Sequence, residues 1–438
     1  MDSVAPNNGF GAVIIGGGIM GCSIALELAR RGYAPLVVDK GPGPGAGSTS
    51  SSSAIIRFNY STPDSVKLAW ESAHMWSQWS EALGVNDELG MARFIRTGLL
   101  VLDSPATPLS KVQRLFDDVG VPYEPLTTSA LQQRFPSLDL GRYYPPKAVS
   151  DEAFWDDKHG DLVAYLTPDA GFVDDPALAA HNLMVAACAV GATFRYRTEV
   201  VGITQRDGRV CAVQLIDGSE ITCAVVVNAA GPHSAKVNGL AGLDPSKGVT
   251  TRPLRQEVDV LPAPHGFSID DGGVIVTDAD LGTYFRPHLG GTLITGGVEP
   301  ECDTLDWVDD PDHFNETPTA EVWEAQTTRV ARRLPDIGVP VRPTGIAALY
   351  DVSSDWVPIY DRSDLDGFYL AIGTSGNQFK NAPMVGPLMA EIIGACEAGR
   401  DHDRDPVSVA CPRTGNTVNL GHFSRTRMVH ATTNSVLG

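Results

Sequence analysis

Three glycines and one aspartate near the start of the chain have the spacing of a nucleotide-binding turn. Gly16, Gly18 and Gly21 form a G-x-G-x-x-G motif, and Asp39 follows eighteen residues after the last glycine. The first glycine permits a tight turn, the second lets the backbone approach a pyrophosphate, and the third lets helix and strand pack closely. An acidic side chain at this distance accepts hydrogen bonds from a ribose. The set predicts a dinucleotide site, with a glycine-rich turn of an unrelated α/β protein as the alternative.

A second candidate binding loop follows the aspartate. Residues 41–53 consist only of Gly, Pro, Ala, Ser and Thr, and most of the hydroxyl side chains gather in Ser48–Ser53. Such a composition also suits a flexible linker. Because the stretch follows a strand end, where loops contact ligands in α/β proteins, we interpret it as a binding loop. The acidic Asp39 suits FAD or NAD rather than NADP, and the hydroxyl loop favours FAD.

These loops need a strand, a helix and a second strand to position them. Ala12–Ile15 is a continuous apolar run, typical of a parallel strand buried on both faces. Helical spacing of apolar residues predicts a helix over Met20–Arg31, which Gly32 ends, and Leu36–Asp39 is a second buried strand. Later predicted elements are helices over Pro176–Gly191 and Pro383–Ala398, strands over Thr193–Tyr196, Cys211–Leu215, Ile221–Val227 and Phe368–Ile372, and an antiparallel sheet between Pro253 and Gly297.

Length and charge bound the class of protein. The 438 residues are 43% hydrophobic and 20% charged, which predicts about two or three folding units rather than disorder. With 33 basic and 53 acidic residues, the net charge is −20, so nucleic acid and anionic membrane surfaces are poor partners. The apolar run Ala12–Leu26 is too short to span a bilayer and lacks the basic flank of a signal peptide.

Cysteine and histidine usage points to a reducing compartment. The seven cysteines are scattered without a C-x-x-C pair, and the ten histidines show no metal-binding spacing. We therefore expect no disulfide scaffold, no metal site and a cytoplasmic location.

The order of short motifs along the chain resembles the glycine oxidase, D-amino-acid oxidase and monomeric sarcosine oxidase family of flavoproteins. The likeness extends from Ala12 to about Gly399 and is closest to the sarcosine oxidase branch. The matching segments are Gly16–Gly21, Ser48–Ser51, Thr97–Leu100, Arg134–Pro136, Gly171–Val173 with Pro176, Val226–Gly231, Tyr284–Pro287 and Gly373–Lys380.

The resemblance implies FAD as cofactor and a set of residues that contact it. These residues are Gly16, Gly18, Ile19, Met20, Gly21, Asp39, Lys40, Ser48, Thr49, Ser50, Ser51, Val200, Ala230, Gly231, Gly376, Asn377, Gln378, Phe379 and Lys380.

Two basic residues resemble the carboxylate clamp of the sarcosine oxidase branch. Arg57 follows Ile55-Ile56 after the hydroxyl loop, and Lys380 ends the segment Gly376–Lys380. An arginine fork and a lysine point charge together can hold one carboxylate. The alternatives are that Arg57 contacts a flavin phosphate or a surface acid, and that Lys380 lies in solvent.

Three tyrosines complete the predicted catalytic set. Tyr284 and Tyr350 match pocket tyrosines of the sarcosine oxidase branch, and Tyr60, three residues past Arg57, is a further candidate. For Tyr284 and Tyr350 the alternative is a core aromatic ring with a satisfied hydroxyl group.

Two positions depart from the pattern of that branch. Ala348 stands where the branch has the cysteine that tethers flavin covalently, so we expect non-covalent FAD. The strand Thr292–Thr295 has no lysine where the branch has an oxygen-activating one. The enzyme is therefore expected to be either a slow oxidase or a dehydrogenase.

The predicted fold is α/β, with a Rossmann-like FAD-binding domain and a second, mixed or antiparallel substrate domain. The expected division is 1–80, 165–245 and 345–400 for the FAD-binding domain, 81–164 and 246–344 for the substrate domain, and 401–438 for a tail, packed or frayed.

The predicted activity is FAD-dependent oxidation of the C–N bond of a carboxylate-bearing secondary amine, an N-substituted glycine or amino acid. The alternatives are oxidation of a primary α-amino acid, a 2-hydroxyacid dehydrogenase, and a non-enzymatic FAD-containing subunit. The expected partners are the small substrate and molecular oxygen or another electron acceptor, with neither nucleic acid nor membrane.

Overall fold

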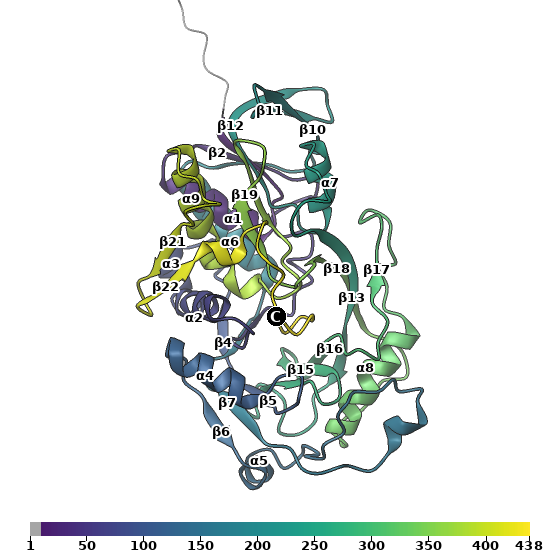
Figure 1. Cartoon of the computed structure of the whole chain (residues 1–438). Helices are drawn as coiled ribbons and strands as arrows, with labels where there is room; N and C mark the ends of the chain where they lie inside the picture. Colours follow the sequence, from purple (N-terminus) through teal and green to yellow (C-terminus); the bar gives the residue numbers. More distant parts are fainter. Residues whose placement is uncertain (1–9) are drawn as a thin grey trace, which may run out of the picture.

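The computed structural model describes residues 10–438, which contain two large sheets (Figure 1). Five parallel strands form the centre of the first sheet, in the order β20-β12-β1-β2-β9; β19 and the β10–β11 hairpin add antiparallel strands. Its strands are β1 (Phe10–Ile15), β2 (Pro35–Val38), β9 (Thr193–Arg195), β10 (Val200–Arg206), β11 (Arg209–Leu215), β12 (Glu220–Asn228), β19 (Ile359–Arg362) and β20 (Phe368–Ile372).

The predicted strand–helix–strand unit at the start of the chain is confirmed. Residues 12–15 of β1 and all of β2 are buried, as expected for parallel strands covered on both faces. Between them, α1 (Ile19–Arg30) packs against α6 (Pro176–Ala189) and α9 (Ala382–Glu397), which cover one face of the sheet. This layer holds the start of α1 at the carboxyl end of β1.

Three further helices pack around the first sheet and its helices. α2 (Pro63–Ser77) packs against α9, α3 (Trp79–Leu83) packs against α6, and α7 (Ser234–Leu240) contacts β10 and β12. A small three-stranded sheet, in the order β3 (Ile55–Ile56), β8 (Gly171–Val173) and β4 (Phe94–Arg96), joins the hydroxyl loop to the middle of the chain.

The second sheet contains the predicted antiparallel strands. Its order is β17-β13-β16-β15-β14-β5-β7-β6, with β18 paired to β13 and a parallel contact between β14 and β5. Its strands are β5 (Leu99–Leu102), β6 (Glu124–Leu126), β7 (Ala164–Thr167), β13 (Thr251–Pro262), β14 (Ile275–Asp278), β15 (Thr283–His288), β16 (Thr292–Gly297), β17 (Asp306–Trp307) and β18 (Gly345–Ser353).

One long helix covers this sheet. α8 (Ala320–Arg333) packs on β13, β15 and β16, and α4 (Leu109–Val119) and α5 (Thr128–Arg134) lie further along the lower part of Figure 1. The fully buried Arg333 of α8 bonds Asp278 at 2.7 Å and Asp280 at 3.1 Å, which ties the helix to the end of β14.

The boundary expected near residue 345 falls before β18. That strand hydrogen-bonds along its whole length with β13 of the second sheet, although residues 345–400 are assigned above to the FAD-binding domain. β19 and β20, which follow, belong to the first sheet. The chain therefore crosses between the sheets after Ser353, and the division into two domains stays a prediction.

The C-terminal segment is packed against the rest of the protein. The hairpin of β21 (Ser408–Cys411) and β22 (Asn416–Asn419) lies on α2, and the fully buried carboxylate of Glu71 accepts the backbone N–H groups of Arg413 and Thr414. Short 3-10 helices are η1 (Glu152–Trp155), η2 (Gly231–His233), η3 (Phe379–Asn381) and η4 (Leu420–Phe423). Within residues 10–438, no helix has the length and apolar character needed to cross a bilayer.

Candidate functional site

The carboxyl ends of three parallel strands meet at the glycine turn. Ile15 of β1 lies beside both Val38 of β2 and Asn228 of β12. Gly16 has φ +112°, and a Cβ there would lie 2.3 Å from the carbonyl oxygen of Ala229, so only glycine fits. This edge of a parallel sheet, beside the start of a helix, is where α/β proteins bind nucleotides.

Asp39 ties two loops together at this edge. Its Oδ2 accepts the N–H of Gly17 at 2.5 Å, and its Oδ1 accepts the N–H of Gly41 at 2.6 Å. Each carboxylate oxygen has a second lone pair, which is available to a ribose hydroxyl. The hydroxyl loop lies against the same turn, because Thr49 Oγ1 accepts the N–H of Ile19 at 3.1 Å.

A cavity of about 780 Å³ runs from this turn to the predicted carboxylate clamp. Ligand sites typically enclose about 300–1,000 Å³. The predicted cofactor residues that line it are Gly16, Gly18, Ile19, Met20, Asp39, Lys40, Ser48, Thr49, Ser51, Val200, Ala230, Gly231, Gly376, Asn377, Gln378, Phe379 and Lys380. Of the predicted catalytic residues, it is lined by Arg57, Tyr284, Tyr350 and Lys380.

Three predicted residues do not line the cavity. Gly21 lies behind the turn, where a Cβ would come 1.9 Å from the carbonyl oxygen of Gly16, so its role is close packing. Ser50 points away and donates to the carbonyl oxygen of Gly47. Tyr60 lies one layer further out and contacts the site through Lys380.

At the far end of the cavity, Arg57 and Lys380 both lie against Tyr60. The Arg57 Cζ is 5.0 Å, and the Lys380 Nζ 5.2 Å, from the centroid of its ring. Lys380 Nζ donates to the Tyr60 hydroxyl oxygen at 3.1 Å and to the carbonyl oxygen of Asn377 at 2.5 Å. Folding thus brings together two cations that are far apart in sequence.

Both cations are short of countercharge. Arg57 is 6% and Lys380 3% exposed. Burial lowers the pKa of each, and for Lys380 the neighbouring Arg57 lowers the pKa further, to well below its usual value. Burial also raises the pKa of Tyr60 to about 12, so its hydroxyl group stays neutral. An anion placed between Arg57 and Lys380 would therefore be strongly attracted.

Two tyrosines from the second sheet line the same end. The hydroxyl groups of Tyr284 and Ser53 are 2.6 Å apart, which links β15 to the hydroxyl loop. The Tyr350 ring packs directly on Gly376 (φ +66°), where a Cβ would come 2.3 Å from the ring. Burial raises the pKa of both tyrosines.

The tail residues Val436 and Leu437 form one wall of the site, which the sequence does not predict. Arg57 donates hydrogen bonds to the carbonyl oxygens of both residues and of Asn59. The N–H of Val436 donates to Glu299 Oε2 at 2.7 Å, and burial raises the pKa of Glu299 to about 8. No periodic pattern in the polar tail signals these contacts, because they are made between residues far apart in sequence.

The loop that follows β17 covers the opposite end of the cavity. Lys40 lines this end, and its ammonium group pairs with Asp312 and lies 2.9 Å from His233 Nε2. Lys236 pairs with the same aspartate at 2.7 Å. Phe314 and Glu316 follow on the same loop and line the cavity as well.

The two departures from the sarcosine oxidase branch can be located. Ala348 lies on β18 and lines the cavity, and none of the lining residues described is a cysteine. On β16, the buried Thr295 donates from its hydroxyl group to the carbonyl oxygen of Tyr284 at 2.7 Å.

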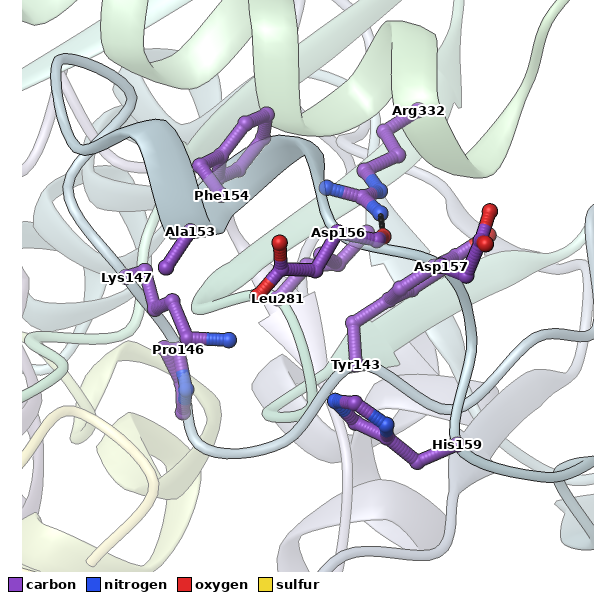
Figure 2. A pocket seen from close by; sticks show the side chains of 10 residues that line it. All are labelled: Tyr143, Pro146, Lys147, Ala153, Phe154, Asp156, Asp157, His159, Leu281 and Arg332. Carbon is purple, nitrogen blue, oxygen red and sulfur yellow. Dashed lines mark hydrogen bonds between the residues drawn. The ribbon is translucent and has the colours of Figure 1, made fainter.

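A second hollow lies between residues 143–159 and α8 (Figure 2). Its volume is about 10 Å³, room for about one water molecule. Arg332 stacks 3.8 Å from the centroid of the Tyr143 ring and donates to the carbonyl oxygen of Asp156. These contacts hold the segment on the helix, and the hollow is too small for a substrate.

Together, a parallel sheet with a glycine turn and an acidic strand end, and a long cavity that ends at buried cations, define a dinucleotide-dependent oxidoreductase. The family described as FAD-dependent oxidoreductase (DAO) matches residues 12–392, and the chain belongs to this family.

Individual relatives agree with this assignment. The chain is 28% identical over 418 residues to FAD-dependent oxidoreductase domain-containing protein 1 of Xenopus laevis, covering 87% of this chain and 78% of that protein. It is 25% identical over 404 residues to sarcosine oxidase subunit beta of Rhizobium meliloti (strain 1021), covering 89% and 85%. The fold matches L-proline dehydrogenase from P. horikoshii with a TM-score of 0.72 and 22% identity, over 96% and 97% of the two chains.

The predicted family, α/β fold, FAD cofactor and enzyme class are thereby confirmed. The residues present also fit FAD. The start of α1 offers N–H groups to a pyrophosphate, Asp39 offers acceptors to a ribose, and the hydroxyl loop follows the cavity toward Arg57.

Proposed function

We propose that the protein oxidises the C–N bond of a carboxylate-bearing secondary amine, such as an N-substituted glycine or amino acid. The observation that carries the proposal is the pair of buried cations, Arg57 and Lys380, at one end of the cavity that FAD would occupy. The relative named sarcosine oxidase subunit beta supports the same substrate class, because sarcosine is a secondary amine with a carboxylate.

In this proposal FAD, when bound, would supply the redox chemistry that side chains lack by accepting a hydride equivalent from the carbon next to nitrogen. The nitrogen lone pair of the substrate would form the C=N bond, and hydrolysis of that bond by water would give a primary amine and a carbonyl compound. No side chain has to remove a proton if the amine binds in its neutral form.

Arg57 and Lys380 orient the substrate. The arginine presents a planar fork and the lysine a point charge, so one carboxylate can bond to both. Holding the acid at this end of the cavity directs the neighbouring C–H bond toward the flavin, and such positioning supplies much of the rate. A bound carboxylate also favours the charged form of Lys380, so binding takes up a proton where the pKa is low.

Tyr284 and Tyr350 supply the walls of the substrate end in this proposal. Tyr284 is buried, Tyr350 is partly buried, and both line the cavity; the Tyr284 hydroxyl group is fixed by Ser53. Tyr60 acts through Lys380, whose ammonium group it contacts.

The experiment is anaerobic bleaching of the bound flavin by matched compounds. The panel contains N-substituted glycines, primary α-amino acids and 2-hydroxyacids. Each acid is compared with its amide, which lacks the negative charge of the carboxylate. We expect N-substituted glycines to bleach the flavin fastest, and their amides at least about 30-fold more slowly, the equivalent of about 2 kcal/mol for one lost partner of a buried charge pair.

Other outcomes identify the alternatives. Faster bleaching by primary amino acids or by 2-hydroxyacids would mean that this class of compound, and not the secondary amines, is the substrate. Amides that react as fast as the acids would contradict the proposal that Arg57 and Lys380 bind a substrate carboxylate. A flavin bleached by no member of the panel would favour a non-enzymatic role.

We also propose that oxygen is a poor electron acceptor, because β16 carries no lysine beside the site. After anaerobic reduction, air should reoxidise the flavin more slowly than an artificial dye acceptor does. Reoxidation by air at least as fast as by the dye would contradict this part of the proposal.

A further inference from the structure

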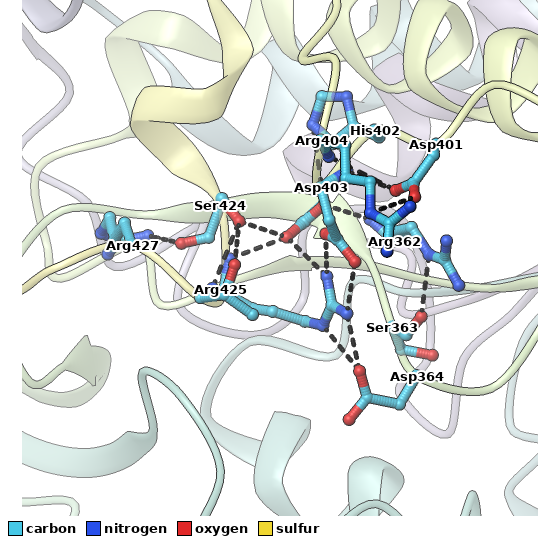
Figure 3. Close-up of polar contacts among 12 residues, drawn as sticks. Arg362, Ser363, Asp364, Asp401, His402, Asp403, Arg404, Ser424, Arg425 and Arg427 are labelled. Atoms are coloured by element: carbon cyan, nitrogen blue, oxygen red, sulfur yellow. Dashed lines mark hydrogen bonds and ion pairs between the residues drawn. The ribbon is translucent and has the colours of Figure 1, made fainter.

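The last fifteen residues of the chain, 424–438, which we name the tail segment, are anchored at their base. Arg425 pairs with Asp361 at 3.2 Å, Asp364 at 2.6 Å and Asp403 at 2.6 Å (Figure 3). These contacts fix the beginning of the segment to β19 and to the loop before β21.

A second anchor follows two residues later. Arg427 pairs with the fully buried Asp355 at 2.7 Å, and the same carboxylate accepts the N–H of His430 at 3.2 Å. Thr432 bonds to the carbonyl oxygen of Asp355 at 2.9 Å. The base of the tail segment is therefore held by ion pairs between residues that do not line the cavity.

The tip of the tail segment, residues 434–438, contacts different residues. Arg57 bonds to the carbonyl oxygens of Val436 and Leu437, and Glu299 accepts the N–H of Val436. The Leu437 side chain is buried in a small apolar cluster that includes Tyr284. Figure 1 shows the yellow end of the chain between the upper sheet and β15.

These contacts place two neutral carbonyl oxygens on the guanidinium group assigned above to the substrate. The Arg57 donors directed at Val436 and Leu437 cannot serve a carboxylate at the same time. A carboxylate brings a full negative charge to arginine and can accept two parallel N–H donors from it, whereas a carbonyl oxygen brings no net charge. The exchange of the tip for an acid is therefore favourable at this group.

We propose that residues 434–438 are a displaceable lid, and that the substrate carboxylate takes Arg57 from the carbonyl oxygens of Val436 and Leu437. The inference rests on the role of Arg57 in the proposed function. Asn434, with φ +49°, separates the anchored base from the tip, and asparagine tolerates this left-handed conformation. The tip moves about this point while the two arginine anchors stay in place.

A lid that must open lowers the apparent affinity for acids. When only a fraction of molecules is open, the apparent dissociation constant is the intrinsic one divided by that fraction. Removing residues 434–438 should therefore tighten carboxylate binding, whereas a fixed wall would leave it equal or weaken it.

The test uses the FAD-loaded protein with benzoate as probe and benzamide as its uncharged control. Binding is followed by the flavin absorbance spectrum, and opening by hydrogen exchange of the peptide that contains Val436. The variants are a chain that ends at Thr433 and Leu437→Ser, which removes the apolar contact without shortening the chain or adding a charge beside Arg57. Met428→Ser is the matched control, because Met428 lies in the same segment and is 90% exposed.

We expect benzoate to bind at least about fivefold more tightly to both lid variants than to the unmodified chain or Met428→Ser. In the unmodified chain, benzoate and not benzamide should speed exchange of the Val436 peptide at least about tenfold. One outcome would contradict the lid alone: benzoate binds more tightly than benzamide, but it binds all four proteins equally and leaves hydrogen exchange of the Val436 peptide unchanged. Benzoate that binds no better than benzamide, even to the shortened chain, overturns the role of Arg57 in the proposed function and the lid with it.

Discussion

Replacing Lys380 with methionine removes one positive charge from the proposed clamp without emptying its space. The two side chains have similar length, and methionine adapts to irregular packing. The carbonyl oxygen of Asn377 loses the lysine donor but keeps the Tyr60 hydroxyl group at 2.6 Å, and that hydroxyl group, which loses its bond from the lysine, keeps this bond to Asn377. We expect the variant to fold and to retain FAD.

The size of the effect follows from burial. Lys380 is 3% exposed, and its partner for the substrate carboxylate would be Arg57 alone after the substitution. Losing one partner of a buried charge pair costs about 2–5 kcal/mol. Since about 1.4 kcal/mol corresponds to a factor of ten, kcat/KM for an acid substrate should fall about 30-fold or more.

The assay compares an acid substrate with its amide in the unmodified protein, Lys380→Met and Lys247→Met, whose exposed lysine lies outside the cavity lining. Only Lys380→Met should lose activity, and only toward the acid. Calorimetric titration with benzoate over a series of pH values, in two buffers of different ionisation enthalpy, should show proton uptake over the range where free Lys380 is neutral, and Lys380→Met should lack it.

An equal loss of activity toward acid and amide would mean that Lys380 shapes the pocket rather than binding the carboxylate. Unchanged kcat/KM would refute its participation altogether. Proton uptake that persists in Lys380→Met would mean that a group other than Lys380 takes up the proton.

Three further predictions concern the cofactor and the tail segment. Asp39→Ala should weaken FAD binding by about 1–3 kcal/mol, because the ribose loses an acceptor and two loop N–H groups lose theirs; flavin fluorescence during dialysis measures this, and unchanged retention contradicts it. FAD should be non-covalent because Ala348 cannot form a thioether, so acid precipitation should leave all the yellow colour in the supernatant rather than in the pellet. The folded pKa of Glu299, about 8, exceeds its unfolded value, so its contribution to stability is complete below about pH 4.5 and is lost as the pH rises through 8, by at most about 1.4 kcal/mol per unit. Glu299→Gln cannot titrate, and its Tm relative to the unmodified protein should therefore rise between pH 5 and pH 9; a constant difference would show that Glu299 does not stay protonated.

The parts of the fold that local pattern determines could be predicted from sequence. The strand, turn and helix over residues 10–30 follow from a buried apolar run and three glycines, all within one α/β unit. β18 pairs with β13 of the second sheet, and no local pattern indicates this pairing because the two strands are distant in sequence. A local signal does mark the start of α2, because Thr62-Pro63 places a proline in the first turn of that helix.

The candidate site shows the same limit. The resemblance to known flavoproteins brings Arg57 and Lys380 to one cavity, and the structure places both there. The tail segment could not be anticipated, because arginine–aspartate pairs between distant residues, and not periodic apolar side chains, hold it in place. Its tip then meets the clamp through backbone carbonyl groups, which every residue type possesses.

The cavity is lined from both large sheets, by the glycine turn of the first and by β13, β15 and β18 of the second. FAD bound there would contact residues of both sheets. Because it would bind the folded chain and not the unfolded one, FAD would stabilise the folded state. A ligand present at a hundred times its dissociation constant adds about 2.7 kcal/mol to the free energy of unfolding. In a cell with little flavin, more chains would be unfolded and open to proteolysis. The amount of this enzyme would then depend on the supply of flavin. Scarce flavin would lower the amount of protein as well as leave the remaining protein inactive.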